Sequence, residues 1–485
     1  MSFCMKLFHF KPLNGAILSS RTAIRLRGRV SAISAFITAI MLGITPAARA
    51  ASIDAFTPDM VEQVPGAPPT LHVEDNYGIF EALAHGDETR LQFIQTELAH
   101  LIQREPTFSH KTMLGFCLSA IARLHGDYDT SNLILNTMAS KLGPIGDPEK
   151  TVNPLDFMIE QTLSGNLLLQ GHIRAWALSQ EQIERQYFKP LRAYYHMPSL
   201  EFSNAQPMTL SVSAESIPNQ VVRLPFLDTV NFNTARSSFT RQGVKAASTH
   251  VILDGETVPA LVGTGTLTGL LPEKFARAHK LRIIGHSDAI SDGSGRRYSG
   301  NFVVVPSLVI GKTVFLNQLF AISRNNETVI GLQQLSQLRH VTITRDAMTY
   351  GLHAPFQCTA DLVTASIRAG YASQWLLPLQ RGTRPEWAMV DTGDNNETVL
   401  HIRTSHLPTD ASNAVSHEFY DSAAGRQSSQ MVTVPTTFSI GSVSIVDQAR
   451  YTLGSTDSIP PALTYGLLKY GSLQFDWPGH KACFN

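Results

Sequence analysis

One short stretch of the chain could hold a carboxylate in position for acid–base chemistry. The apolar residues 387–390 end on Asp391-Thr392-Gly393, a carboxylate followed by a tight turn. A strand that delivers a carboxylate to such a turn fixes its position, and the next hydroxyl and the backbone amides can hydrogen-bond to it. The same triplet also makes ordinary turns, so by itself it does not specify a function.

A second, altered copy of this stretch lies upstream. Residues 259–262 lead into Gly263-Thr264-Gly265, in which glycine takes the place of the aspartate. An Ile-Gly pair follows each turn at a similar interval, with Gly311 48 residues after Gly263 and Gly441 50 residues after Asp391. Independent loops are not expected to agree so closely. The chain is therefore predicted to contain two copies of one β-rich unit, at residues 248–360 and 361–485.

The order of elements in each copy is a strand into the turn, a hairpin, an Ile-Gly hairpin and an apolar-apolar-Gly strand. The last element is Val329-Ile330-Gly331 in the first copy, and Thr452-Leu453-Gly454 is its expected counterpart in the second. This order resembles a lobe of the retropepsin-like aspartic proteases. The resemblance implies an all-β, bilobal domain of the retropepsin or pepsin type, with Gly263 and Asp391 facing each other between the lobes.

The resemblance also implies roles for single residues. Asp391, Thr392 and Gly393 correspond to the catalytic turn, and Gly263, Thr264 and Gly265 correspond to a degenerate second turn. The glycine-rich residues 292–300 would form the flap of the first lobe, with Gly293, Gly295 and Tyr298 near the bound peptide. An exposed hairpin without a substrate role would have the same composition.

Catalysis in this family needs two carboxylates that share one proton, because two like charges about 3 Å apart cannot both ionise. Gly263 has no side chain, so we expect Asp391 to be an ordinary ionised carboxylate at neutral pH. A second carboxylate could come from Asp391 of another chain, or from Asp254 or Asp288. Otherwise catalysis is lost and the fold binds peptide only.

Two classes of function therefore stay open at this stage. The first is an exported aspartic endopeptidase that acts on peptides or proteins through Asp391. The second is a catalytically inactive pseudoprotease that serves as a peptide-binding or scaffold protein. No serine-hydrolase, zinc-protease or phosphate-loop motif is present. We expect no cofactor and no metal, and we interpret Asp394 and Glu397 as solvated loop carboxylates and His401 as an ordinary surface or core histidine.

The N-terminus predicts export. Basic residues precede an apolar run from about residue 30 to 44, and Ala48-Arg49-Ala50 supplies the small residues of a cleavage site. Residues 1–50 are read as a signal peptide, since the run is shorter than the roughly 20 residues of a membrane-spanning anchor. The mature protein is expected in the periplasm or outside the cell, with no membrane contact after cleavage.

A linker at residues 51–76 precedes a region of helical periodicity at residues 77–200. His85-Gly86-Asp87 and His125-Gly126-Asp127 resemble the turns of tetratricopeptide-like helical hairpins. This domain would either pack against the rest of the chain or dock a protein partner, or it would be a helical prodomain or cap with no partner. Residues 201–247 are expected to be a β-rich connector, which gives an α+β multidomain protein.

The cysteines fit an oxidising compartment without requiring it. Cys117 lies in a helical pattern and is expected to be buried, whereas Cys358 and Cys483 lie 95 and 92 residues after the two turns. These two cysteines therefore occupy similar places in the two copies, and either form a disulfide or stay as unrelated thiols.

Composition excludes one class of partner. The chain has 485 residues, 43% of them hydrophobic and 16% charged, and its 39 basic residues balance 39 acidic ones. A net charge of zero gives no general attraction to nucleic acid or to an anionic membrane.

Overall fold

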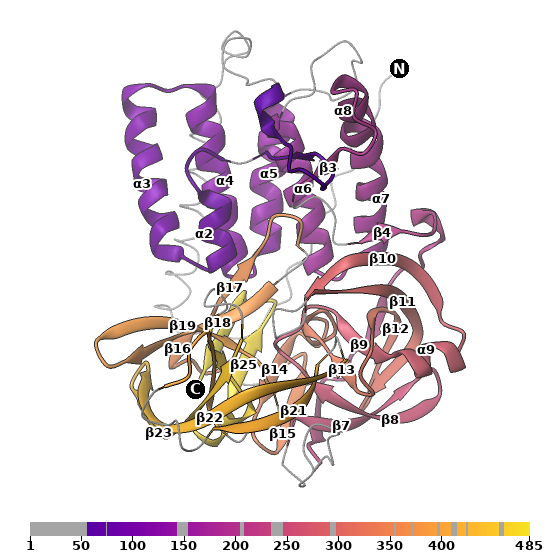
Figure 1. Ribbon diagram of the computed structural model, residues 1–485, viewed down its shortest axis with the longest axis vertical. Helices are drawn as coiled ribbons and strands as arrows, with labels where there is room; N and C mark the ends of the chain where they lie inside the picture. Colours follow the sequence, from indigo (N-terminus) through magenta and orange to yellow (C-terminus); the bar gives the residue numbers. More distant parts are fainter. Residues whose placement is uncertain are drawn as a thin grey trace, which may run out of the picture.

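The computed structural model describes residues 56–73, 75–142, 154–203, 208–233, 246–291, 297–353, 356–370, 373–394, 398–408, 415–422, 425–454 and 460–485. The predicted signal peptide lies outside these residues. No helix in the described part is long and apolar enough to cross a membrane. Helices gather in one half of the molecule and strands in the other (Figure 1), so the fold is α+β.

The described residues between 79 and 194 are mainly helical. They are α2 (Ile79–His85), α3 (Glu88–Arg104), α4 (Phe108–Leu124), α5 (Tyr128–Leu142), α6 (Pro154–Leu169), α7 (Ile173–Ile183) and α8 (Lys189–Tyr194), with a π-helical stretch, η3 (Glu184–Phe188), before α8. Neighbouring helices pack through apolar side chains that recur three and four residues apart, such as Leu91, Ile94 and Leu98 of α3. Cys117 lies in this core, with its Sγ 3.2 Å from the carbonyl oxygen of Leu91.

The turns between paired helices follow the sequence signal. Gly86 and Gly126 have φ angles of 67° and 71°, which favour glycine. The aspartates that follow them cap the next helices, because Asp87 accepts the amide of Arg90 and Asp127 accepts that of Thr130. A third turn of this kind, at Gly171, joins α6 to α7.

The first lobe is built on a nine-stranded sheet with the order β4-β10-β11-β7-β8-β13-β9-β12-β5. Its strands are β4 (Thr209–Leu210), β5 (Val221–Arg223), β7 (Ser248–Leu253), β8 (Glu256–Val262), β9 (Gly269–Pro272), β10 (Arg282–Ser291), β11 (Arg297–Ile310), β12 (Thr313–Ser323) and β13 (Thr328–Ile330). Two short helices, α9 (Glu273–Ala278) and α10 (Leu332–Ser336), follow β9 and β13. At the centre, β8 runs parallel to β13, β13 is antiparallel to β9, and β9 is parallel to β12.

The second lobe repeats this arrangement in an eight-stranded sheet with the order β17-β18-β19-β24-β20-β23-β22-β21. Its strands are β17 (Val363–Ser366), β18 (Ser373–Arg381), β19 (Arg384–Val390), β20 (Leu400–Thr404), β21 (Ser416–Ser422), β22 (Gly425–Ile440), β23 (Val443–Leu453) and β24 (Ala462–Leu463). Here β19 is parallel to β24, β24 antiparallel to β20, and β20 parallel to β23. The internal duplication is therefore a property of the fold.

A six-stranded sheet joins the lobes, with the order β16-β26-β25-β14-β15-β6. Its strands are β6 (Leu227–Asn231), β14 (His340–Ile343), β15 (Ala347–Gly351), β16 (Ala360–Asp361), β25 (Leu473–Asp476) and β26 (Lys481–Phe484). Each lobe gives three strands, and the halves meet where β14 pairs with β25. One continuous hydrophobic core includes residues of both lobes and of this sheet, among them Val262, Val390 and Phe475.

Topology corrects two sequence-based boundaries. Thr452-Leu453-Gly454 is not the counterpart of Val329-Ile330-Gly331, because Thr452 and Leu453 end β23 beside β20. The true counterpart is Ala462-Leu463-Thr464, which runs beside β19 before the 3-10 helix η6 (Tyr465–Lys469). The segment 201–247 is not only a connector, since β4, β5 and β6 are hydrogen-bonded into the sheets of the first lobe.

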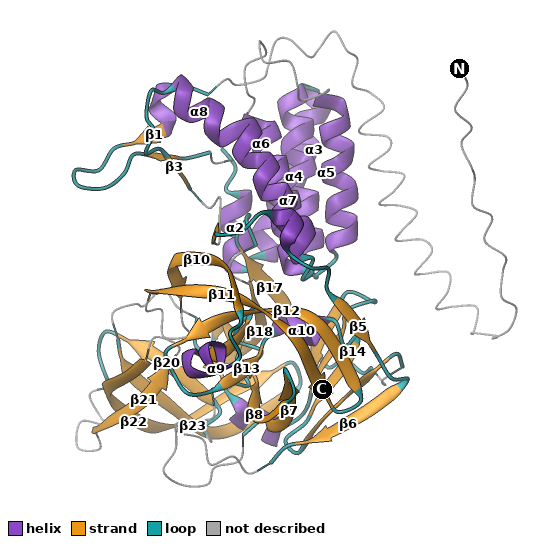
Figure 2. Cartoon of the chain, turned by 90° about the vertical axis from the view of Figure 1, so that its right-hand side faces the viewer, coloured by secondary structure: helices purple, strands orange, loops and turns teal. Residues whose placement is uncertain are grey.

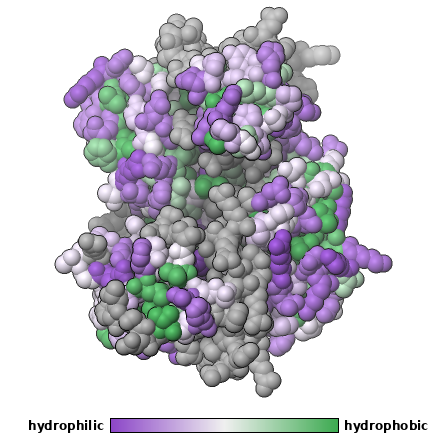
Figure 3. All heavy atoms as spheres, in the orientation of Figure 1, coloured by the Kyte–Doolittle hydropathy of each residue, from purple (hydrophilic) through white to green (hydrophobic). Residues whose placement is uncertain are grey.

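The helical half stands on the β half (Figure 2). The buried guanidinium of Arg123 donates to the carbonyl oxygens of Ile367 and Arg368, in the turn between β17 and β18, at 2.6 and 2.9 Å. Gly165 of α6 lies against the same turn so closely that a Cβ would come 2.1 Å from the oxygen of Arg368. On the face seen in Figure 3, hydrophobic residues form small separate patches over the β half. The helices are thus an integral part of the structure and not a loosely attached module.

Candidate functional site

The two predicted turns meet between the lobes. Thr264 Oγ1 donates to the carbonyl oxygen of Val390 at 2.8 Å, and Thr392 Oγ1 donates to that of Val262 at 2.5 Å. Each hydroxyl also accepts the backbone amide of the opposite threonine, at 3.2 Å for the Thr264 amide and 3.1 Å for the Thr392 amide. Both threonines are fully buried. This reciprocal pair of hydrogen bonds locks the end of β8 to the end of β19.

The glycine at the third position of each turn, Gly265 or Gly393, leaves room for the carboxylate at this junction. A Cβ on Gly265 would lie 2.2 Å from Cγ of Asp391, and one on Gly393 would lie 3.3 Å from Cα of Gly263. Gly393 donates its amide to Asp391 Oδ1 at 2.9 Å. The first lobe therefore forms part of the carboxylate's immediate surroundings, and any side chain at position 265 would collide with it.

Burial raises the pKa of Asp391 to about 6, and the nearby negative charge of Asp394 adds to this effect. The amides of Gly393 and Gly265 act in the opposite direction, because they stabilise the ionised form. Our expectation of an ordinary carboxylate is therefore wrong. Most of the shift comes from loss of solvent, which does not need a second catalytic aspartate.

Asp394 belongs to a hydrogen-bonded chain that the sequence did not reveal. His401 Nδ1 lies 2.7 Å from Asp394 Oδ2, and His401 Nε2 lies 2.8 Å from Thr452 Oγ1. Burial raises the pKa of Asp394, but His401 and the cations Arg450 and Arg403 outweigh it and lower that pKa overall. Asp394 is thus a structured anion next to Asp391 and not a solvated loop carboxylate. Glu397, its companion in the sequence, lies outside the described residues.

The matching position of the first lobe contains no acid. A Cβ on Gly263 would lie 2.7 Å from Val329 Cγ1, so the valine fills the space that a side chain would need. Thr266 Oγ1 would lie 3.7 Å from the same Cβ. This hydroxyl is buried and has no hydrogen-bond partner within the described part of the chain. The first lobe therefore keeps a polar group beside a position that lacks its carboxylate.

Neither alternative acid replaces it. Asp254 lies in the turn before β8, at the opposite end of that strand from Gly263, and it contacts His279 at 3.2 Å. Asp288 lies on β10 with 89% of its side chain exposed, and it contacts His286 at 3.0 Å.

The hairpin that was predicted as the flap is formed by β10 and β11, but its tip, including Gly293 and Gly295, lies outside the described residues. Tyr298 is buried on β11, in one hydrophobic cluster with Ile290 of β10 and with Leu261 and Val329. Its ring therefore belongs to the packed face of the first lobe that lies next to the turn.

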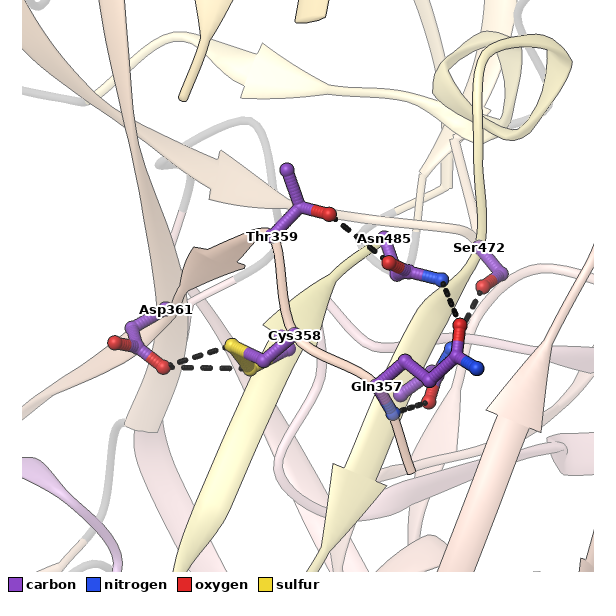
Figure 4. Close-up of a disulfide and its surroundings, with 8 residues drawn as sticks. Gln357, Cys358, Thr359, Asp361, Ser472 and Asn485 are labelled. Atoms are coloured by element: carbon purple, nitrogen blue, oxygen red, sulfur yellow. Dashed lines mark hydrogen bonds between the residues drawn. A yellow bond between two sulfur atoms is a disulfide. The ribbon is translucent and has the colours of Figure 1, made fainter. Parts of the chain in front are cut away.

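A disulfide joins Cys358 to Cys483, with their Cα atoms 5.2 Å apart (Figure 4). The carboxylate of Asp361 lies 2.9 Å from Cys358 Sγ and 3.3 Å from Cys483 Sγ. These three residues are close enough together to hold a metal ion, but disulfide sulfurs are not the thiolates that bind metals.

The two cysteines do not occupy equivalent places. Cys483 lies on β26 and pairs with Asp361 of β16, whereas Cys358 lies between β15 and β16, beyond the end of the strand that takes the place of β26 in the first lobe. The agreement between the two turn-to-cysteine intervals was therefore coincidental, although the intervals between turn and Ile-Gly pair reflected true equivalence.

Comparison with known proteins adds a coarse likeness. No family model and no curated protein matches the chain. Among solved structures, the chain is similar to a retropepsin-like aspartic protease from Rickettsia conorii, with 17% sequence identity and a TM-score of 0.19. The similarity covers 28% of this chain and 98% of the other.

Proposed function

We propose that the protein is a peptide-binding member of the aspartic-protease architecture that has lost hydrolysis. One observation carries this proposal: the two turns are locked together as a catalytic pair would require, but only one of them holds a carboxylate. Hydrolysis needs one acid that activates water and a second that polarises the scissile carbonyl. Asp391 can fill one of these roles, and Gly263 can fill neither.

The surroundings of Gly263 support the loss of activity. Val329 occupies the space beside Gly263 that an acidic side chain at position 263 would need. A second chain cannot supply the missing turn without disrupting the fold, because Thr264 of the same chain already holds Thr392. The retained Asp391 would then serve as a hydrogen-bonding group toward a bound peptide.

Peptide binding can be tested with a randomised pool of fluorescent octapeptides. We expect saturable binding by fluorescence anisotropy, with intact peptide recovered by mass spectrometry. Asp391→Ala should weaken binding roughly fivefold, because one hydrogen bond contributes about 1 kcal/mol. Asp288→Ala is the matched control, since Asp288 is an exposed acid away from the turns. Absence of binding in every pool would refute the proposal.

A second function, an aspartic endopeptidase, is favoured by one observation. Asp394 adds to the raised pKa of Asp391, so the site does contain two neighbouring carboxyl groups. However, His401 and two arginines hold Asp394 in its ionised form. An ionised group cannot donate the proton that a scissile carbonyl needs, and for this reason we rank hydrolysis second.

We also propose that the protein is exported, on the basis of residues 1–50 and of a disulfide that suits an oxidising compartment. N-terminal sequencing of protein recovered from a bacterial periplasm should begin at Ala51. Recovery of uncleaved chain from the cytosol would contradict export.

A further inference from the structure

A cavity of about 520 Å³ lies where the helical half meets both lobes. Its walls come from the turn between α4 and α5, from the turn between α6 and α7, and from the seam between α10 and the strands β18 and β26. In Figure 2, α10 lies within the β half, close to β12. None of the cavity's lining residues belongs to the Asp391 turn or to the Gly263 turn.

Specific contacts hold this cavity open in one shape. Gln333 Nε2 donates to the carbonyl oxygen of Leu168 at 2.6 Å and fixes the end of α6 on α10. His480 Nδ1 lies 3.2 Å from the carbonyl oxygen of Gly126, and its Nε2 lies 3.5 Å from Asp127. A cavity whose walls are tied together in this way loses little entropy when it binds a ligand.

Two exposed cations lie in the lining of the cavity. Arg339 and Lys481 are exposed residues of the lining, and neither has an ion-pair partner among the described residues. A hydrogen bond to Glu88 raises the pKa of His125, which favours its cationic form. Among the described residues, Asp129 is the only carboxylate of the lining, and it accepts a hydrogen bond from Gln170 at 3.1 Å. The lining therefore favours an anionic ligand.

Aromatic rings form another part of the wall. Trp375 and Trp477 both line the cavity and both pack on Phe475, with ring centroids 5.7 and 4.9 Å from it. Flat apolar walls next to cations that lack an ion-pair partner suit a ligand that combines an aromatic ring with an acid group. The volume also lies within the range of about 300–1,000 Å³ that is usual for small-molecule sites.

We propose that this cavity binds an aromatic carboxylate, with the acid group held by Arg339 and Lys481 and the ring packed against Trp477. The carboxylate has two sources with the same chemistry, a free aromatic acid or the C-terminal aromatic residue of a peptide. The proposal does not depend on the function proposed for the Asp391 site.

Calorimetric titration of the full mature chain tests this proposal. The probes are N-acetylphenylalanine, its amide, phenylacetate and the peptide acetyl-Ala-Ala-Phe. We expect the acids to bind at least tenfold more tightly than the amide, and their binding to weaken as salt is added. Tighter binding of the tripeptide than of phenylacetate identifies a peptide terminus as the source, and the reverse order identifies a free acid.

Substitutions of the lining residues test whether these ligands bind in this cavity. Arg339→Gln combined with Lys481→Gln should weaken binding of N-acetylphenylalanine about tenfold or more, whereas Lys274→Gln on α9 should leave it unchanged. Trp477→Ala should also weaken binding of N-acetylphenylalanine, because it removes the ring that packs against the ligand and changes no charge. Unchanged thermal unfolding of the unliganded variants shows that they are folded. Equal affinity for acid and amide, or unchanged binding by the double variant, would overturn the proposal, as would no binding of any probe.

Discussion

The two lobes follow the same strand order and present the same turn, yet their surroundings have diverged at one position. Beside Asp391, the neighbouring strand β24 contributes Ala462, paired with Met389. Beside Gly263, the equivalent strand β13 contributes Val329, paired with Leu261. The smaller residue accompanies the carboxylate, and the larger residue fills the space where the carboxylate is missing. The first lobe thus has a packed valine where the second lobe has a carboxylate, while the hydrogen bonds between Thr264 and Thr392 involve both lobes equally.

Giving the first lobe an acid at the position that corresponds to Asp391 should change the rate of peptide cleavage more than any other substitution. Gly263→Asp combined with Val329→Ala recreates both the acid and the space for it, since the valine otherwise lies 2.7 Å from the new Cβ. We expect peptide cleavage at acidic pH to rise about 100-fold or more over the native protein, which is a usual contribution of one acid–base group. Mass spectrometry of a peptide pool between pH 3 and 6 measures this.

Gly263→Ala with Val329→Ala is the control for that variant, because it changes packing without adding an acid. Gly263→Asp alone should gain less, since Val329 must move to admit it. A folded double variant that cleaves no faster than its control would show that the lobes differ in more than this pair of residues.

The outer ends of the joining sheet give a second contrast between the lobes. Replacing Cys358 and Cys483 by alanine should lower the free energy of unfolding by about 3–4 kcal/mol, because the disulfide closes a loop of 125 residues. In the half of the sheet that comes from the first lobe, Tyr350 of β15 and Asp228 of β6 are joined instead by a hydrogen bond of 2.9 Å. Tyr350→Phe should cost only about 1 kcal/mol. Urea unfolding measures both losses of stability, and equal losses would contradict the prediction that the disulfide contributes more than the hydrogen bond.

The raised pKa of Asp391 predicts how stability depends on pH in the second lobe. A carboxyl group whose folded pKa of about 6 exceeds its unfolded value of 3.8 favours the folded state when protonated. This contribution is complete below pH 4 and is lost as the pH rises to 6. Relative to the native protein, Asp391→Asn should therefore gain up to about 3 kcal/mol between pH 4 and pH 7.

Denaturant titrations of both proteins at several pH values check this prediction. Gly263 has no titratable side chain, so this pH dependence of stability should arise in the second lobe only. A stability difference that does not change with pH would mean that Asp391 is solvated and has an ordinary pKa.

The reciprocal hydrogen bonds of Thr264 and Thr392, one from each lobe, should contribute equally to the free energy of unfolding. Thr264→Val and Thr392→Val each remove a buried hydroxyl that both donates and accepts a hydrogen bond. Each substitution should lower the free energy of unfolding by about 2 kcal/mol. The double variant should cost less than the sum, because each substitution already disrupts the partner's bonds. Additive losses, or losses that differ greatly between the two, would show that these hydrogen bonds are not reciprocal.

Local repetition explains which features the sequence could predict. The helical turns at Gly86 and Gly126, the duplicated strands and the position of both turns depend on short patterns with a clear physical cause. The counterpart of Val329 was missed because Ala462-Leu463-Thr464 lacks the glycine of the expected motif. The place of Cys483 was misjudged because spacing along a chain does not determine strand register.

The electrostatics of the site needed the three-dimensional structure. His401 lies seven residues from Asp394, and nothing in that spacing indicates that its ring bridges Asp394 and Thr452. Likewise, the pKa of Asp391 depends on burial by both lobes, which an isolated triplet cannot show. The cavity between the helices and the lobes joins residues from distant parts of the chain, so no single motif marks it.

The most direct test of the account is a hydrolysis assay of the native protein and Asp391→Asn. Both are incubated with the same unstructured peptide pool from pH 3 to pH 8, and the products are identified by mass spectrometry. We predict that the two proteins leave the pool equally intact at every pH, because one carboxylate lacks the second acid that the reaction requires. Cleavage by the native protein that Asp391→Asn abolishes would contradict the account and establish an active protease.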